Sequence, residues 1–365
     1  MRILFLVSDS HWSGRARAFA TAAAGLSARG HEVHIACDAD CPVHSRLVQE
    51  KVSVVPMSPH ATGAGETWQL RRELLERGVD VVFVHGDAEH FTASSALRLG
   101  RGAGAVIRRI PPFAQASERS GGRVASRLAP SGLLFSTEAD RQAATDTRYA
   151  LPPALAPIGV DATAYDRVTA AAKAALGARP DARLVVCVHD GGDRRGVLTA
   201  MRTLSLLAPR HPELHLAVVG APHMDELRMH GAALGINAMM SLLGTRDDEL
   251  AVLRAADVGW VAADSDAGAF ATLDFMGLRV PVIASRSPLT EHYVSDGIAG
   301  LLLGPGDPAS TAALVATFLA KRDQHAAMGN AARTRVQRDF PFDAMIAGYE
   351  QAITAAAGRR ARPVA

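Results

Sequence analysis

Short apolar runs alternate with helical patterns along the first half of the chain. Runs rich in β-branched and other apolar residues occupy 2–8, 31–37, 52–57, 79–86, 105–110 and 132–137. Apolar residues at helical spacing occupy 15–30, where Gly30 ends the pattern, and 66–77. This alternation of strand and helix predicts a parallel sheet with helices on both faces.

The same alternation of predicted strands and helices begins again in the second half of the chain. Predicted strands at 183–190 and 214–220 flank a helix at 196–212, and the runs AMMSLLG, VGWVAA, VPVIAS and GLLL continue the series. The proline-rich segment YALPPALAPIGVDATAYD separates the halves, so the boundary is predicted within 155–162. We predict an α/β protein with domains at 1–158 and 159–340. An amphipathic helix in 341–365 would pack back toward the first domain, ahead of a basic tail.

Composition narrows the class of protein. The chain has 365 residues, 48% of them hydrophobic and 21% charged, and a net charge of +2, which fits two globular domains without a strong electrostatic partner. Cys37, Cys41 and Cys187 are too few for a disulfide framework and suit a reducing cytosol. Because no second Cys/His pair follows Cys37 and Cys41, no metal site is predicted. MRILFLVSDS is too short for a secretory signal, and no run reaches the roughly 20 apolar residues of a membrane span.

Three loops that follow predicted strands contain the candidate chemistry, because open parallel sheets bind ligands at the carboxyl ends of their strands. In the first, SDSHWSGRAR (8–17), Ser13 and Gly14 precede a helix whose N-terminus favours an anion. The loop lacks G-x-G-x-x-G, so a dinucleotide site is not supported. A plain strand-to-helix turn is the alternative.

The second loop, HDGGDRRG (189–196), combines flexible glycines, Gly191 among them, with two arginines. Arg194 and Arg195 precede a helix, and a planar guanidinium suits phosphate oxygens. Adjacent surface arginines that are simply solvated are the alternative.

The third loop, DAGAFATLDFMGLRVPVIAS (266–285), carries two carboxylates eight residues apart. We predict a helix from about Phe270 to Leu278, with Gly268 and Ala269 keeping the preceding loop small for a diphosphate. Asp266 and Asp274 could then accept hydrogen bonds from sugar or ribose hydroxyls. In the alternative, Asp266 caps the helix and Asp274 is solvated.

Two further features leave the function open. His85 follows a buried strand, where it is either a site residue or a histidine whose hydrogen bonds are satisfied within the fold. Residues 98–127 carry seven arginines against one glutamate, which would fit an anionic acceptor or a membrane surface, or a solvated loop. Phe113 is the only aromatic residue among these arginines, so nucleic acid is not predicted.

In order and spacing, these segments resemble the family-4 glycosyltransferases of the GT-B fold, over nearly the whole chain. The matching phrases are SGRARAFATAAAGLSARGHEV, IGVD (158–161), RRG (194–196) with PELHLAVVG, LLGTRDDELAVLRAAD (242–257), and the Asp-x7-Asp pair before Pro281. The resemblance implies two Rossmann-like domains with parallel sheets facing across a cleft. It also implies a cytoplasmic, retaining, metal-independent hexosyltransferase in cell-envelope or polysaccharide synthesis. The arginine-rich stretch 98–127 would allow a peripheral contact with the inner face of the membrane.

The resemblance also implies residue roles. Asp266 would contact the donor sugar, Asp274 the ribose, and Arg194 with Arg195 the diphosphate of a UDP- or GDP-linked donor. Gly191, Gly268, Ala269 and Phe270 would line the donor site, and Gly244 and Thr245 would lie near the base. Ser13, Gly14 and Arg109 would form the acceptor and phosphate loop, and His85 would join Asp266 in catalysis. No resident cofactor is implied.

The chain differs from the family at several positions that the family motifs assign to catalysis and donor binding. Both family glutamates are aspartates here, Arg108 and Arg109 replace a histidine, and an arginine usual before the basic loop is missing. A catalytically impaired nucleotide-binding or scaffold protein is therefore the alternative to a transferase, and a nucleotide-sugar epimerase is a third hypothesis. The sugar, the acceptor and the oligomeric state are not readable from the sequence.

Overall fold

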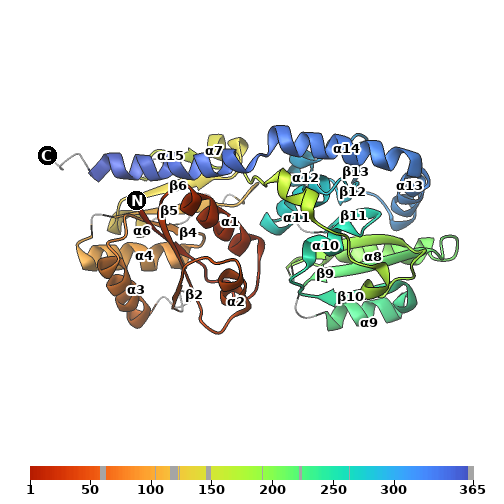
Figure 1. Ribbon diagram of the computed structural model, residues 1–365, viewed down its shortest axis with the longest axis horizontal. Helices are drawn as coiled ribbons and strands as arrows, with labels where there is room; N and C mark the ends of the chain where they lie inside the picture. Colours follow the sequence, from red (N-terminus) through yellow and green to blue (C-terminus); the bar gives the residue numbers. More distant parts are fainter. Residues whose placement is uncertain are drawn as a thin grey trace. The chain divides into compact units, whose positions relative to one another are not determined.

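The computed structural model divides into two compact units (Figure 1), and it describes residues 1–57, 63–102, 104–115, 122, 124–144, 149–190, 192–221, 224–262 and 264–360. Unit 1 comprises Met1–Ile158 and Asp343–Ala365, and unit 2 comprises Gly159–Phe342. In the described part of the chain, no helix has both the length and the apolar character needed to cross a bilayer.

Unit 1 is built on a parallel sheet in the order β3-β2-β1-β4-β5-β6-β7. Its strands are β1 (Arg2–Leu6), β2 (Glu32–Cys37), β3 (Val54–Pro56), β4 (Val81–Val84), β5 (Ala105–Ile110), β6 (Ser131–Phe135) and β7 (Ala154–Leu155). The helices are α1 (Gly14–Ala28), α2 (Pro42–Gln49), α3 (Ala64–Glu76), α4 (Asp87–Gly100), α6 (Ala125–Leu128), α7 (Glu138–Ala143) and α15 (Phe342–Arg360).

Helices cover both faces of this sheet. On one face, alternate residues of β1, β4 and β5 pack with the apolar sides of α3 and α4. On the other face, Phe5 and Phe83 stack on each other and both contact Tyr349 of α15, and Phe5 also contacts Phe19 of α1. Burial on both faces explains why the strands read as continuous apolar runs rather than as alternating patterns.

Unit 2 contains a second parallel sheet, in the order β10-β9-β8-β11-β12-β13. Its strands are β8 (Arg183–His189), β9 (Leu214–Gly220), β10 (Met240–Gly244), β11 (Val258–Val261), β12 (Val282–Ser285) and β13 (Gly300–Leu303). Its helical segments are η1 (Ala162–Arg167), η2 (Lys173–Leu176), α8 (Arg195–Leu207), α9 (Asp225–Ala233), η3 (Asn237–Met239), α10 (Glu249–Arg254), α11 (Asp266–Gly277), α12 (Pro288–Tyr293), α13 (Pro308–Ala320) and α14 (Arg322–Asp339).

The core of unit 2 forms on both faces of its sheet. Helices α8, α9 and α13 pack on one face. On the other, α11 lies so close to β11 that a Cβ on Gly259 would come within 2.5 Å of the Phe275 ring. Almost every residue of α11 is buried, which explains why this helix is apolar on all sides. The two parallel, helix-covered sheets confirm the predicted α/β class.

The predicted elements differ from the structure in two respects. Helix α11 begins at Asp266 rather than near Phe270, so Gly268 and Ala269 lie inside the helix and not in the loop before it. Ser265, with extended backbone, starts the helix, and burial of the whole segment outweighs the poor helix propensity of glycine. The helices α2, α4, α6, α7, α12, α13 and α14 were not predicted.

Candidate functional site

The strand order of the unit 2 sheet reverses between β8 and β11. Strands β9 and β10 follow β8 on one side of the sheet, whereas β11, β12 and β13 are added on its other side. In open parallel sheets, ligands bind at the carboxyl ends of the strands at such a reversal. The loop from Asp190 to Arg194 follows β8, and the segment from Ala262 to Asp266 follows β11, so the fold brings together two loops that the sequence singled out.

The two loops are in contact, and two helices begin there. Ser265 Oγ donates a hydrogen bond to Asp190 Oδ2 at 3.3 Å. The first turn of α8 packs against the end of β11, where a Cβ on Gly196 would lie closer than 3.0 Å to the backbone oxygen of Ala262. The N-termini of α8 and α11 therefore lie side by side. Amides in the first turn of a helix have no partner within that helix, and both helix dipoles favour an anion at this place.

Replacement of Gly196 by alanine is expected to destabilise unit 2 by about 2 kcal/mol, because the new methyl group overlaps a backbone that cannot rotate away. Urea denaturation measures the change in the free energy of unfolding. Gly306→Ala is the matched control, since nothing lies within 4 Å of a Cβ placed there. Equal stability of the two variants would show that α8 does not need this close approach.

The two arginines of the basic loop are held by neighbouring carboxylates. Arg194, the residue before α8, forms an ion pair with Glu226 at the start of α9. Arg195 Nε donates to Asp193 Oδ2 at 2.6 Å, although the arginine side chain is 91% exposed. This hydrogen bond holds the pKa of the Asp193 carboxyl below its usual range. Both arginines lie at the start of α8, after β8. To bind a phosphate, each guanidinium would have to divide its N–H donors between the phosphate and its present carboxylate partner.

Asp266 is the first residue of α11 and is buried, which places its carboxylate at the positive end of the helix. Asp264, two residues earlier, is exposed and accepts a hydrogen bond from Ser287 Oγ at 3.0 Å. Gly268, Ala269 and Phe270 follow in the first turns of α11 and are also buried. Asp266 is not the N-cap residue of α11 as the alternative predicted; Ser265 occupies that position, without a capping hydrogen bond from its side chain.

Asp274 lies two turns further along α11, about 12 Å from Asp266 along the helix axis. It is fully buried, so it is not the solvated residue of the alternative interpretation. Tyr165 Oη donates to Asp274 Oδ1 at 2.6 Å, from a residue 109 positions away. The Tyr165 ring fits over Gly277, where a Cβ would overlap it.

A buried arginine supports this tyrosine. The Arg333 guanidinium lies 5.9 Å from the centre of the Tyr165 ring, and donates to the oxygen of Gly277 at 2.7 Å and to Asp166 at 2.9 Å. These contacts hold the Asp274 carboxylate in place. The sequence singled out Asp274 by its spacing from Asp266, but no short motif connects Asp274 with Tyr165 or Arg333.

Two more predicted donor residues lie at the end of β10, the edge strand, which β9 separates from β8. Gly244 ends β10 with φ of +67°, a left-handed conformation that favours glycine, and Thr245 beside it is exposed. Gly191, also predicted to bind the donor, lies outside the described residues.

His189 is a candidate that the sequence reasoning missed. It ends β8, directly before Asp190, and its side chain is buried. Burial is the main cause that lowers the pKa of this imidazole. Within the described residues its Nδ1 has no hydrogen-bond partner. Its position immediately before the glycine loop was the available signal.

Unit 1 has its own reversal of strand order, between β1 and β4. Ser13 caps α1, accepting a hydrogen bond from the Ala16 amide at 3.1 Å, and Gly14 begins that helix. His85 follows β4, stacks on Phe19 with ring centres 3.8 Å apart, and contacts the Arg15 oxygen through Nε2 at 3.1 Å. The fold therefore brings the predicted Ser13–Gly14 loop and His85 together.

Protonation of His85 is strongly disfavoured. Since a carbonyl oxygen accepts, the proton of the neutral ring lies on Nε2, and Nδ1 has no partner in the described part of the chain. Burial, helped by the Arg109 and Arg15 guanidinium groups, holds the pKa of His85 well below 6.5. The ring is thus a neutral group that positions the loop, and its catalytic role stays a prediction.

Two charged residues, Glu89 and Arg108, contact the backbone around His85, and of these only Glu89 was not singled out from the sequence. Glu89 accepts hydrogen bonds from the amides of Ser8, His85 and Gly86 at 3.2, 2.8 and 2.8 Å, and so ties the ends of β1 and β4 together. Arg108 donates to the His85 oxygen at 3.1 Å and to Asp87 at 2.5 Å. Arg109, the next residue on β5, is buried. A capping pattern, glycine followed three residues later by glutamate, was the signal for Glu89.

The arginines between 98 and 127 do not form one surface in the part of the chain that the structure describes. Arg98, Arg101 and Arg127 are exposed, whereas Arg108 and Arg109 are buried in β5. Arg119 and Arg123 lie outside the described residues. The thiols of Cys37, Cys41 and Cys187 are buried and free. No three His, Cys, Asp or Glu side chains of the described residues are grouped as a metal site requires.

Two family models match the chain, one in each half. The model "Glycosyl transferase 4-like domain" matches residues 13–144, and the model "Glycosyl transferases group 1" matches residues 168–335. Together they cover most of the sequence, including all of the described candidate residues in both units.

Curated relatives match part of the chain. A D-inositol 3-phosphate glycosyltransferase of Mycolicibacterium gilvum is 28% identical over 60% of this chain and 52% of its own length. The lipopolysaccharide core biosynthesis glycosyltransferase LpsE of Rhizobium meliloti is 23% identical, over 52% of this chain and 55% of its own. The chain thus spans about half the length of these relatives.

Solved structures match the fold over nearly the whole chain. Anabaena Alr3699/HepE, in complex with UDP and glucose, has a TM-score of 0.79 at 16% identity and covers 97% of this chain and 100% of its own. Sucrose-phosphate synthase from Thermosynechococcus elongatus has a TM-score of 0.73 at 16% identity, covering 98% and 100%. At such identities the likeness describes the fold.

Proposed function

The chain belongs to the family-4 glycosyltransferases with a GT-B fold, and from this premise we propose that it transfers a sugar from a nucleoside diphosphate sugar to an acceptor hydroxyl. The observation that carries the proposal is the meeting of the α8 and α11 N-termini at the strand-order reversal of unit 2. Two helix dipoles and two arginines at one place favour a diphosphate. Uridine is the first base to test, since the Anabaena structure contains UDP.

The two aspartates of α11 suit the two ends of such a donor. Their separation of about 12 Å along the helix would let Asp266 accept from sugar hydroxyls and Asp274 from the ribose. Because Asp274 is fully buried and accepts from Tyr165, the second contact requires the Tyr165 hydrogen bond to rearrange on binding. In the reaction, the bond between the anomeric carbon and the diphosphate oxygen breaks. The acceptor oxygen bonds to that carbon, and its proton goes to the departing diphosphate.

The stereochemistry and the metal independence of the reaction are inferred from the family. We propose that the product retains the anomeric configuration. Charge that develops on the leaving diphosphate would be stabilised by Arg194, Arg195 and the first-turn amides, without need of a metal ion. The acceptor, whether glycan, lipid or small molecule, stays a prediction, as does a contact with the membrane.

A nucleotide-binding test examines the proposal directly. UDP, GDP, ADP and TDP are each added to the wild type, Asp274→Asn and the exposed control Asp323→Asn. One nucleotide at 100 times its Kd is expected to stabilise the wild type and the control by about 2.7 kcal/mol, and Asp274→Asn by less. Absence of any shift in melting temperature would contradict a donor site. Product NMR with the matching sugar nucleotide then reports transfer and the anomeric configuration.

A nucleotide-binding protein without transfer is the second candidate, favoured by the acidic character of the loop after β8. Asp193 and Glu226 hold Arg195 and Arg194, and Asp190 lies in the same loop beside Ser265. Carboxylates there would oppose a diphosphate whose charge increases as the sugar leaves. Nucleotide binding with no product from any acceptor would favour this candidate.

A further inference from the structure

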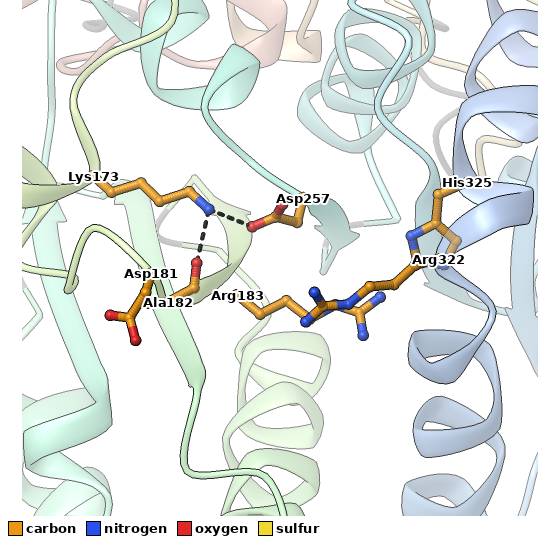
Figure 2. A pocket seen from close by; sticks show the side chains of 7 residues that line it. All are labelled: Lys173, Asp181, Ala182, Arg183, Asp257, Arg322 and His325. Carbon is orange, nitrogen blue, oxygen red and sulfur yellow. Dashed lines mark hydrogen bonds and ion pairs between the residues drawn. The ribbon is translucent and has the colours of Figure 1, made fainter.

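A basic pocket lies at the amino ends of strands β8 and β11 in unit 2 (Figure 2). It has a volume of about 260 Å³ and is lined by Lys173, Asp181, Ala182, Arg183, Asp257, Arg322 and His325. Arg183 begins β8, Asp257 precedes β11, and Arg322 and His325 belong to the first turn of α14. Because β8 and β11 are parallel, their amino ends lie opposite their carboxyl ends, where the loops with Arg194 and Asp266 follow. The pocket is therefore separate from the donor site.

Arg183 is the central feature of this pocket. It is only 7% exposed, and within the described residues its Nη2 has no hydrogen-bond partner. Burial, followed by the nearby Arg322 guanidinium, lowers the pKa of Arg183. Figure 2 shows the two guanidinium groups close together in the pocket. A buried cation with an unfilled donor, beside a second cation, is costly unless an anion completes the site.

The carboxylates of the pocket are committed to other donors. Asp257 Oδ2 accepts from Lys173 Nζ at 2.7 Å and from the Leu184 amide at 2.8 Å. The Asp181 side chain is 76% exposed and pairs with Arg179 at 3.6 Å. Asp257 and Glu213 do act electrostatically on Arg183, but neither fills its Nη2.

Helix α14 adds to the positive field of the pocket. It runs for 18 residues, and the side chain of Lys321, the residue before it, makes no capping hydrogen bond. The N-terminal end of a helix of this length carries a partial positive charge. His325, in its first turn, has Nε2 3.0 Å from the Phe318 oxygen. The N-terminus of α14 and Arg322 on it, together with Arg183 at the start of β8, thus supply positive charge from two segments.

We propose that this pocket binds a phosphate group, either inorganic phosphate or the phosphate of a small monoester. Two planar guanidinium groups and a helix N-terminus match the several oxygens and double charge of a phosphate better than a single carboxylate. The volume leaves room for a small organic group on one phosphate oxygen. The bound anion would join α14 to the start of β8 and so stabilise unit 2.

Isothermal titration in phosphate-free buffer at constant ionic strength tests the proposal. Inorganic phosphate and glycerol 3-phosphate are titrated separately, with acetate as the carboxylate control. One saturable phosphate site is expected, weakened at least about tenfold in Arg183→Met and in Arg322→Gln and unchanged in Arg338→Gln. Arg338 is the matched control because it is exposed and lies at the far end of α14. Tighter binding of glycerol 3-phosphate would identify a monoester site, and equal or weaker binding a site for the free ion.

Three results would overturn the proposal: no saturable heat with either phosphate compound, equal binding by all four proteins, or tighter binding of acetate. Arg183→Met is expected to melt at or above the wild-type temperature without phosphate, because it removes a buried charge that has no anion. Arg322 is exposed, so its variant tests the site even if the Arg183 variant fails to fold. Nucleotide binding should be unchanged in Arg322→Gln, which separates this site from the proposed function.

Discussion

Replacement of Asp266 by asparagine is expected to lower kcat/KM for sugar transfer by about 100-fold or more, with UDP binding changed less than about threefold. The carboxylate lies buried at the N-terminus of α11, where it would accept hydrogen bonds from the donor sugar and not from the nucleotide. Loss of its charge therefore acts on the step in which the sugar transfers. Steady-state kinetics with the sugar nucleotide and titration with UDP measure the two effects.

Asp264→Asn is the matched control for this prediction. Asp264 stands two residues earlier in the same loop and is exposed, with Ser287 Oγ as its donor. It should keep kcat/KM within about threefold of the wild type. Equal loss in both variants would assign the effect to the loop and not to Asp266. A large loss of UDP binding in Asp266→Asn would place this residue at the nucleotide instead.

Acidification from pH 6.5 to 4 is expected to cost unit 1 about 3 kcal/mol of unfolding free energy through His90 alone. Burial, with a smaller effect of the Arg108 guanidinium, lowers the pKa of His90 to about 4. In the unfolded chain the ring takes up a proton near pH 6.5, so below that pH the unfolded state binds more protons. The contribution is fully present above pH 6.5 and is lost progressively toward pH 4.

The contacts of His90 explain why its folded ring stays neutral. Ser131 Oγ donates to the Ala129 oxygen at 3.0 Å, so it accepts from His90 Nε2, also at 3.0 Å. The proton is thereby fixed on Nε2, and Nδ1 has no acceptor among the described residues. A second proton on this ring would be buried without a partner.

Urea denaturation at pH 7 and pH 4.5 measures this effect. The wild type should lose more unfolding free energy between the two pH values than His90→Gln, by about 2 to 3 kcal/mol. His44→Gln, in α2 of the same unit, is the control and should follow the wild type. An identical pH dependence in wild type and His90→Gln would mean that the buried ring titrates near its ordinary pKa.

The sequence by itself determined the α/β class and predicted which loops could bind a ligand. Continuous apolar strands alternating with helices require a sheet that is buried on both faces, because only such a sheet removes both sides of each strand from water. Ser13, His85, Arg194 and Asp266 follow predicted strands, so the parallel arrangement alone places them at strand ends. The order of motifs, more than any single one, identified the family.

Only the tertiary structure decided which side chains meet. The start of α11 at Asp266 depends on burial of the whole helix, a long-range effect that local propensity does not contain. Tyr165 reaches Asp274 across 109 residues, and Arg183 lies beside Arg322 although 139 positions separate them in the numbering. The hydrogen bonds and charges of such pairs leave no periodic pattern in the sequence, because they depend on which elements the sheet order makes neighbours. For this reason the loops that follow β8 and β11 were predictable, whereas the network around Asp274 and the basic pocket were not.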